Sequence, residues 1–519
     1  MRTAEMLRET HERQPDKLAL TFGDQQWTYT ELDEVTDRVG AGLAAAGVHA
    51  NDRVAFWMPN CPELFFSYLA CFKIGAIAVP LNHRYKLPEA RYAIEHSGAT
   101  TLILHTDKLP EISALPLAEL GLARGFLVAG SRGAQGDTAI CRGTELRRFA
   151  ELLETAEKLP APTFGPRQLA TIIYTSGTTS RPKGVVQSQE SLWNCARIQT
   201  ASMQFTAEDV LLVTTSASHC AATFGFLFPN LFAGGVSVLL DAPTPAEVAA
   251  AITRRRVTRC QMLPPELLDL VEYLEEHPTD VSSLRSVQCG GDVVPRDTLD
   301  RFRAVVGFDV SELVGMTETI TYCANPPFGE KRLGSVGLPA VDTEIKIIDP
   351  HGNELPRGET GEIHVRSGSN MVGYWNDTLN TVATICDGWV ATGDLGRIDN
   401  EGYLWFVGRQ KEIIIRGGSN ISPLEVEEVI DQHPSVHNSG VVGFADRRLG
   451  QVVVAYVSLR HGATSTPDEA ELRKFVAERL AAYKTPERFF LLEELPLGPT
   501  GKVDRRELHR RLPRDMGKC

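Results

Sequence analysis

The stretch Tyr174-Thr-Ser-Gly-Thr-Thr-Ser-Arg-Pro-Lys183-Gly184-Val185 follows directly on residues 168–174, an apolar run with the pattern of a buried strand. Small residues let backbone N–H groups come close to an anion. The Ser and Thr hydroxyls add hydrogen-bond donors, and Lys183 adds a positive charge. The Walker spacing GxxxxGK(S/T) is absent from this stretch, which excludes a P-loop NTPase reading of it. The stretch therefore predicts a loop that holds a polyphosphate.

Strand and helix patterns alternate in the sequence on both sides of this loop. We expect helices over residues 31–46 and 62–74, and strands over residues 53–58 and 76–80. This rhythm predicts an α/β fold with a parallel sheet covered by helices. Further strands are expected over residues 168–174, 211–214, 236–240 and 259–263.

Between residues 343 and 407 the alternation of strands and helices gives way to short strands and turns. Short strands, such as 344–348 and 361–366, are separated by Asp-Pro, Asn-Gly and Arg-Gly turns, which predicts a small β-barrel-like or meander unit. After Arg409 the chain has strands and helices of its own, for example over residues 452–459 and 469–481. We place a domain boundary near residues 409–411. It separates a large N-terminal domain with parallel or mixed sheets, residues 1–409, from a small α+β C-terminal domain, residues 410–519.

Composition excludes several classes of protein. The chain has 519 residues, 43% of them hydrophobic, and a formal net charge of −13. A length of this order suggests more than one domain, and the absence of a basic run argues against a nucleic-acid partner. We expect no membrane span and no signal peptide. The ten cysteines are scattered and mostly have apolar neighbours, so we expect reduced thiols and a cytoplasmic protein.

Five more strings in the sequence combine glycines with charged or hydroxyl residues. Each is a weak signal alone, but their order and spacing along one chain are specific. The strings are Cys289-Gly290-Gly291-Asp292, Val314-Gly315-Met316-Thr317-Glu318-Thr319, Ala391-Thr392-Gly393-Asp394-Leu395, Gly408-Arg409-Gln410-Lys411-Glu412 and Thr500-Gly501-Lys502-Val503-Asp504. Together with the phosphate loop, they resemble the adenylate-forming superfamily, which includes acyl-CoA synthetases, firefly luciferase and the adenylation domains of nonribosomal peptide synthetases. The resemblance covers nearly the whole chain.

The resemblance implies a role for each string. ATP and Mg²⁺ would be bound, and a carboxylic acid would be converted to an acyl-adenylate. Lys502 would be the catalytic lysine of this step, and Lys411 would be the hinge about which the small domain rotates. The residues implied in ATP or AMP binding are Thr175, Ser176, Gly177, Thr178, Thr179 and Lys183 in the loop, Gly290, Gly291 and Val314 near the adenine, Thr317 at a phosphate, Glu318 at Mg²⁺, Asp394 at the ribose, and Arg409 at the ribose or a phosphate.

Two positions depart from the commonest family pattern. Ser180 replaces a glycine of the phosphate loop, as in the similar loop of carnitine-type CoA ligases, and should stiffen the loop slightly. Val314 replaces the aromatic residue that stacks on adenine, so we expect weaker stacking there.

The family's substrate-gate histidine corresponds to His219. The resemblance places the acid pocket around Cys220, Ala221, Phe224 and Gly315. Small residues at this place leave room for a branched, aryl or medium-chain acid, and a carnitine-like acid stays open. The Asp with which amino-acid-activating relatives pair the substrate ammonium is missing here, which argues against an amino acid.

Coenzyme A is the acceptor that the resemblance favours, because no carrier-protein or reductase segment follows Lys502 in this sequence. Arg84 and Gly418 match family positions near coenzyme A. The hypothesis is therefore an AMP-forming acyl-CoA synthetase, with fatty acid metabolism as one setting. The alternatives are a ligase that loads a carrier-protein thiol, a non-catalytic nucleotide-binding relative, and a luciferase-like oxygenase. The sequence does not indicate an oligomeric state.

Overall fold

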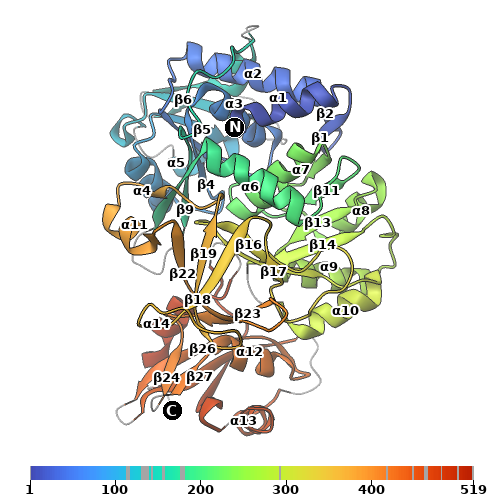
Figure 1. Ribbon diagram of the computed structural model, residues 1–519, viewed down its shortest axis with the longest axis vertical. Coiled ribbons are helices and arrows are strands. Elements are labelled where there is room, and N and C mark those ends of the chain that lie inside the picture. The colour runs from blue at the N-terminus through green and yellow to red at the C-terminus, as the bar shows by residue number, and fades with distance from the viewer. Residues whose placement is uncertain are drawn as a thin grey trace.

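The computed structural model describes residues 2–112, 117–129, 139–141, 144–154, 158–175, 182–291, 294–416, 419–446, 449–460, 466–480, 482–498 and 502–516. Two large sheets and their helices form the upper part of the molecule in Figure 1, a small β unit lies below them, and a fourth sheet occupies the C-terminal end. The predicted α/β class, with mixed sheets and a β unit between residues 343 and 407, is confirmed.

The first sheet has its central strands in parallel. Its order is β17-β16-β15-β14-β13-β11-β12-β1-β2, and β15 to β17 and the β1–β2 pair are antiparallel. The carboxyl ends of its parallel strands therefore meet at one edge, where α/β proteins place their ligands. The strands are β1 (Leu18–Phe22), β2 (Gln25–Thr28), β11 (Val210–Val213), β12 (Val236–Leu239), β13 (Arg259–Met262), β14 (Ser286–Gly290), β15 (Ser311–Met316), β16 (Ile320–Ala324) and β17 (Leu338–Pro339).

The second sheet has the order β20-β10-β9-β4-β3-β5-β6-β8-β7. Its β9 and β10 form an antiparallel pair, and the short strand β20 adds to the outer side of β10. The strands are β3 (Arg53–Trp57), β4 (Ile77–Leu81), β5 (Thr101–His105), β6 (Arg124–Val128), β7 (Ala139–Cys141), β8 (Thr144–Arg148), β9 (Leu169–Thr175), β10 (Lys183–Ser188) and β20 (Gly373–Tyr374).

Two smaller sheets follow in the chain. The third has the order β18-β19-β22-β21, with β23 paired to β22, and the fourth has the order β25-β24-β27-β26, with β28 paired to β27. The third contains β18 (Thr343–Ile348), β19 (Gly361–Ser367), β21 (Ile385–Cys386), β22 (Trp389–Ile398) and β23 (Leu404–Arg409). The fourth contains β24 (Ile414–Arg416), β25 (Ser419–Ile421), β26 (Val436–Asp446), β27 (Gly450–Leu459) and β28 (Arg488–Leu492).

Helices α2 and α3 begin or end at capping residues, proline or glycine that can be recognised in the sequence. Pro62 and the left-handed Gly75 bound α3, and the Thr28 side chain forms a capping box with Glu31 at the start of α2. One expected helix, 469–481, is shorter in the structure. The helices are α1 (Thr3–Arg13), α2 (Tyr29–Ala45), α3 (Pro62–Ile74), α4 (Leu87–Ser97), α5 (Leu109–Ile112), α6 (Gln189–Ser202), α7 (Phe228–Ala233), α8 (Pro245–Arg255), α9 (Pro264–Glu276), α10 (Arg296–Val306), α11 (Thr378–Thr384), α12 (Pro423–Asp431), α13 (Glu469–Ala477) and α14 (Arg505–Met516).

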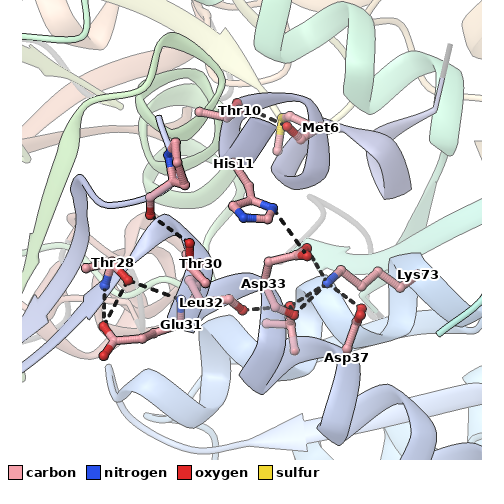
Figure 2. A network of polar contacts seen from close by, with 12 residues as sticks. Met6, Thr10, His11, Thr28, Thr30, Glu31, Leu32, Asp33, Asp37 and Lys73 are labelled. Carbon is pink, nitrogen blue, oxygen red and sulfur yellow. Dashed lines mark hydrogen bonds and ion pairs between the residues drawn. The ribbon is translucent and has the colours of Figure 1, made fainter. Parts of the chain in front are cut away.

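A buried ionic network joins the first three helices (Figure 2). Lys73 Nζ donates to Asp33 Oδ1 and Asp37 Oδ1, each at 2.7 Å, and to Thr36 Oγ1 at 2.8 Å. His11 Nδ1, from α1, lies 3.7 Å from the other Asp33 oxygen. Because three donors of one ammonium meet these acceptors, two carboxylates are tolerated in the core, and the network fixes α3 against α2.

Among the cysteines whose side chains the structure describes, seven are buried as free thiols, and Cys386 is exposed. Burial raises the pKa of Cys71, and of most of the others, above the ordinary thiol range. In the part of the chain that is described, no helix combines the length and the apolar character that a membrane crossing requires.

Candidate active site

The predicted phosphate loop connects β9 to β10. Thr175, at the end of β9, pairs with Lys183, at the start of β10, so the antiparallel ladder fixes both ends of the loop. Lys183 Nζ donates to Asn380 Oδ1 at 2.9 Å and lies 4.6 Å from the centre of the Tyr374 ring. The predictions for Ser176, Gly177, Thr178, Thr179 and Ser180 fall outside the described residues.

Thr317 and Glu318 lie in the turn between β15 and β16, at the edge of the first sheet. Glu318 is only 7% exposed, and Tyr374 donates its hydroxyl to Glu318 Oε1 at 2.7 Å. Burial raises the pKa of Glu318, whereas the Tyr374 hydrogen bond and the charges of Arg409 and Lys183 act to lower it. The net shift is upward, so burial outweighs the neighbouring groups that favour the ionised carboxylate.

The turn after Glu318 contains an unusual backbone conformation. Ile320 has φ of 59°, although it is a buried β-branched residue, for which the left-handed region is an outlier. A Cβ at Gly315, on the facing strand, would lie 2.5 Å from the Ile320 carbonyl oxygen. The two strands therefore approach so closely that glycine is required at position 315, and the surrounding structure holds the Thr317–Glu318 turn in a strained shape.

The glycines predicted near the adenine lie where β14 ends. Gly290 is the last residue of β14, and a Cβ there would meet the Leu313 carbonyl oxygen at 2.5 Å. Gly291 follows with φ of 92°, a left-handed conformation that glycine adopts without strain. Val314, on the neighbouring strand β15, packs partly against the core of the third sheet.

Asp394 and Arg409 are opposite each other in β22 and β23. Arg409 Nε lies 3.4 Å from Asp394 Oδ1, and Asp394 is 5% exposed. Burial raises the pKa of Asp394 to about 6, although the charges of Arg409 and Lys502 act to lower it. This carboxylate can accept two hydrogen bonds from a cis-diol, as the predicted ribose role requires.

Lys502 is brought to the same region by a short turn near the end of the chain. Gly498 N donates to the Lys502 carbonyl at 2.7 Å, and Leu497 bridges to Val503. Its positive charge acts on Asp394 and also on His219, two residues far away in the sequence. The charge of this C-terminal lysine therefore reaches both the predicted ribose carboxylate and the predicted substrate gate.

His219 lies after β11, in a turn where its backbone N–H donates to Ser216 O at 2.9 Å. Burial, and then the charge of Lys502, lower the pKa of His219 to about 4. The Ala221 backbone N–H lies 3.3 Å from His219 Nδ1, an arrangement that suits a neutral ring with Nδ1 as acceptor. The imidazole is therefore uncharged at neutral pH.

The segment after His219 forms a π-helical turn, Ala221–Leu227. Of the predicted pocket residues, Ala221 and Phe224 lie within this turn and Cys220 lies just before it. Cys220 Sγ lies 3.3 Å from Thr317 Oγ1, so its thiol faces the phosphate motif. Phe224 is 1% exposed and packs edge-on against Tyr68 in the core. Ala221 is partly exposed, and the pocket roles of Cys220, Ala221 and Phe224 stay predictions.

A cavity of about 270 Å³ lies near the carboxyl ends of β4, β11 and β12. Arg84 is on its wall, beside Asn82 and His83, and the Arg84 backbone N–H donates to Asn82 Oδ1 at 2.9 Å. Asp241 and Asp269 also line the cavity, and burial raises the pKa of both. Lys411 follows β23 in a turn, and Gly418 lies outside the described residues.

The motif search missed Tyr374 and Asn380, which contact Glu318 and Lys183. Both belong to the segment between β19 and β22, which the sequence marked only as part of a β unit. No short-range pattern could have assigned them, because they reach the site through the pairing of β20 with β10.

These groups define a class of protein: an enzyme that binds a nucleotide phosphate chain in a partly buried, positively charged site. The cations of this region are Lys183, Arg409 and Lys502, and Asp394 has the two carboxylate oxygens that the predicted diol acceptor requires. Glu318 is a buried carboxylate beside a phosphate lysine, the kind of ligand that Mg²⁺ uses together with phosphate oxygens, so the residues present fit that ion.

Comparison with known proteins gives the family. The model of the AMP-binding enzyme family matches residues 7–375, and that of the AMP-binding enzyme C-terminal domain matches residues 425–502. The chain belongs to the family of AMP-binding enzymes.

Two curated relatives and two solved structures illustrate the likeness. The chain is 34% identical to indoleacetate–CoA ligase of Aromatoleum aromaticum, over 94% of each protein. It is 33% identical to a feruloyl-CoA synthase of Amycolatopsis sp, over 96% of each. The ATP-bound structure of MatB from Rhodopseudomonas palustris matches with a TM-score of 0.89 at 29% identity, covering 98% of this chain and 99% of that one, and apo MatB matches with 0.79.

Proposed function

We propose that this enzyme is an ATP-dependent ligase that joins an aromatic carboxylic acid to coenzyme A through an acyl-adenylate. ATP, Mg²⁺ and coenzyme A are its co-substrates and cofactor, and AMP and pyrophosphate are its products. The observation that carries the proposal is that the positive charge of Lys502 acts on both His219 and Asp394, because this links the candidate acid gate to the candidate nucleotide site. The aromatic preference is supported by the two curated relatives, whose names specify indoleacetate and ferulate.

The first half-reaction brings two anions together. The acid's carboxylate attacks the α-phosphorus of ATP, the bond to the β-phosphate oxygen breaks, and pyrophosphate leaves with that bond's electron pair. Catalysis then consists mainly of alignment and charge neutralisation. Lys183 and Lys502 supply positive charge from this chain, and Glu318 would hold Mg²⁺, which adds further charge neutralisation when bound. Because the His219 ring is neutral, it would not form an ion pair with the carboxylate of the acid, which leaves that carboxylate free to attack ATP.

The second half-reaction needs the thiol of coenzyme A to reach the acyl carbon and expel AMP. The cavity beside Arg84 is a candidate for part of the coenzyme A site, because it offers one guanidinium and several hydrogen-bonding groups. The carboxyl groups of Asp241, Glu266 and Asp269 also line this cavity, so Arg84 is the group there that would attract an anionic ligand. A carrier-protein thiol is the alternative acceptor.

We also propose that the chain divides at residues 409 and 410 and that the C-terminal part rotates about Lys411 between the half-reactions. Two observations support this division: β23 ends at Arg409 in the third sheet, and β24 begins at Ile414 in the fourth. The higher TM-score against ATP-bound MatB than against apo MatB supports assigning this structure to the adenylation arrangement. We place the enzyme in the cytoplasm, where ATP and coenzyme A are available.

The experiment that tests the proposal is an acid panel with ATP, Mg²⁺ and coenzyme A, scored by mass spectrometry for the acyl thioester and for AMP. Aryl, arylacetic and cinnamic acids should give the highest kcat/KM, above medium-chain fatty acids and carnitine-like acids. Highest activity on an aliphatic acid would overturn the aromatic preference. Acyl-AMP without thioester, rescued by a carrier protein, would overturn the choice of acceptor.

A further inference from the structure

One segment of the chain, residues 369–375, links the Glu318 turn to the strand that begins with Lys183. At its first end, Ser369 Oγ donates to Thr319 O at 2.9 Å, and Met371 N donates to Glu318 O at 2.7 Å. At its second end, Trp375 N donates to Gly184 O at 2.7 Å, and β20 pairs with β10. This connecting segment thus holds the backbones of two predicted ATP-binding motifs that come from different sheets.

Tyr374 is the side chain of the connecting segment that faces both motifs. Its hydroxyl donates to Glu318 Oε1 at 2.7 Å, and its ring centre lies 4.6 Å from Lys183 Nζ. Its own backbone N–H donates to Thr381 Oγ1 at 2.9 Å, which ties it to α11. The ring is therefore fixed between a carboxylate and an ammonium, with a different kind of contact to each.

We infer that Tyr374 is a positioning residue for Mg²⁺–ATP: its hydroxyl orients the Glu318 carboxylate toward the metal, and its ring holds the Lys183 ammonium beside the phosphate loop. The hydroxyl occupies one carboxylate oxygen and thereby fixes the rotation of the carboxylate plane. A phenol–carboxylate hydrogen bond is charge-assisted, so it is strong enough to select one orientation. The inference rests on the proposed Mg²⁺ role of Glu318 and adds a residue that acts through it.

The two contacts of Tyr374 can be removed separately. Tyr374→Phe keeps the ring beside Lys183 and removes the hydroxyl, and with it the hydrogen bond to Glu318. Tyr374→Leu removes both contacts. Loss of the hydroxyl should weaken ATP binding only when Mg²⁺ is present, whereas loss of the ring should weaken ATP binding with and without the metal.

The test is isothermal titration calorimetry of ATP binding without acid or coenzyme A, performed over a range of Mg²⁺ concentrations and in EDTA. For Tyr374→Phe we expect the Mg²⁺ concentration at half-effect to rise about tenfold, the low end of what losing a hydrogen bond to a charged group produces. The affinity for metal-free ATP should stay within about twofold of wild type. A misfolded fraction would lower the binding stoichiometry and leave this Mg²⁺ midpoint unchanged.

Tyr403→Phe is the matched control, because the Tyr403 ring has the same 4.6 Å contact with a cation, Arg332, outside the site. It should change neither measurement. The double variant Glu318→Gln, Tyr374→Phe should bind Mg²⁺–ATP no worse than Glu318→Gln alone, since the hydroxyl acts through that carboxylate. Tyr374→Leu should weaken metal-free ATP binding as well.

The outcomes separate this inference from the proposed function. A wild-type enzyme whose ATP affinity does not depend on Mg²⁺ would overturn the metal role of Glu318 and this inference with it. If the wild type depends on Mg²⁺ but the Tyr374→Phe midpoint stays within about twofold, only the role of Tyr374 is refuted. An additive loss in the double variant would also refute it, because a general structural defect adds to the loss of Glu318.

Discussion

Replacing Lys502 with alanine should abolish one half-reaction and spare the other. The charge of Lys502 acts on both His219 and Asp394, the candidate acid gate and the candidate ribose carboxylate. Its charge is needed while negative charge builds up around the α-phosphate. Losing one preorganised donor of this kind costs on the order of 10²–10³ in rate. Pyrophosphate release from ATP and acid should therefore fall by about that factor.

The assay for the spared half uses synthetic acyl-AMP and coenzyme A. Lys502→Ala should form thioester from them at close to the wild-type rate, because no charge accumulates on a leaving pyrophosphate in this step. The structure gives a second readout: removing a nearby cation should raise the pKa of His219 from about 4 toward its ordinary value, as followed by NMR titration. Lys474→Ala, at an exposed lysine on α13, is the matched control. Near-normal pyrophosphate release by Lys502→Ala would refute the assignment.

Four further outcomes are expected. In pH profiles, kcat/KM for ATP should fall below about pH 6 as Asp394 becomes protonated. Arg409→Gln should move this fall to higher pH, because it removes a cation that lowers the pKa of the Asp394 carboxylate. If the fall in kcat/KM stays at the same pH, Asp394 is not its origin. Ala221→Trp should depress kcat/KM for the bulkiest good acid more than for acetate, and an equal loss on all acids would remove Ala221 from the pocket wall. Lys411→Pro should preserve acyl-AMP formation and impair thioester formation, whereas equal losses would place the hinge elsewhere. Lys73→Met should lower the free energy of unfolding by about 3–5 kcal/mol, because two buried carboxylates lose their ammonium partner; a loss below about 1 kcal/mol in urea unfolding would contradict the network's role.

The fold follows closely from local sequence signals. Helix α3 has the predicted bounds because proline begins it and glycine ends it. The strands of the parallel sheet were found because apolar runs bounded by turn residues are typical of buried strands. Helix α13 ends before the predicted residue, at Ala477, because an apolar periodicity marks a face more reliably than an end.

The site was less predictable wherever long-range packing decides it. The sequence did not show that residues 221–227 form a π-helical turn, which shifts side chains off the usual helical spacing. Phe224, which lies in this turn, is buried against Tyr68. Tyr374 escaped notice because only the β20–β10 pairing brings it to Glu318 and Lys183.

The most direct test of the central claim follows oxygen. The enzyme is given an aromatic acid labelled with ¹⁸O in both carboxylate oxygens, together with ATP, Mg²⁺ and coenzyme A, and the products are weighed by mass spectrometry. If the acid is activated as an acyl-adenylate, the bond to the acyl carbon breaks when the thiol attacks, and one labelled oxygen stays on AMP. Labelled AMP in a one-to-one ratio with thioester is the expected result. Unlabelled AMP, or ADP with labelled phosphate, would contradict the account.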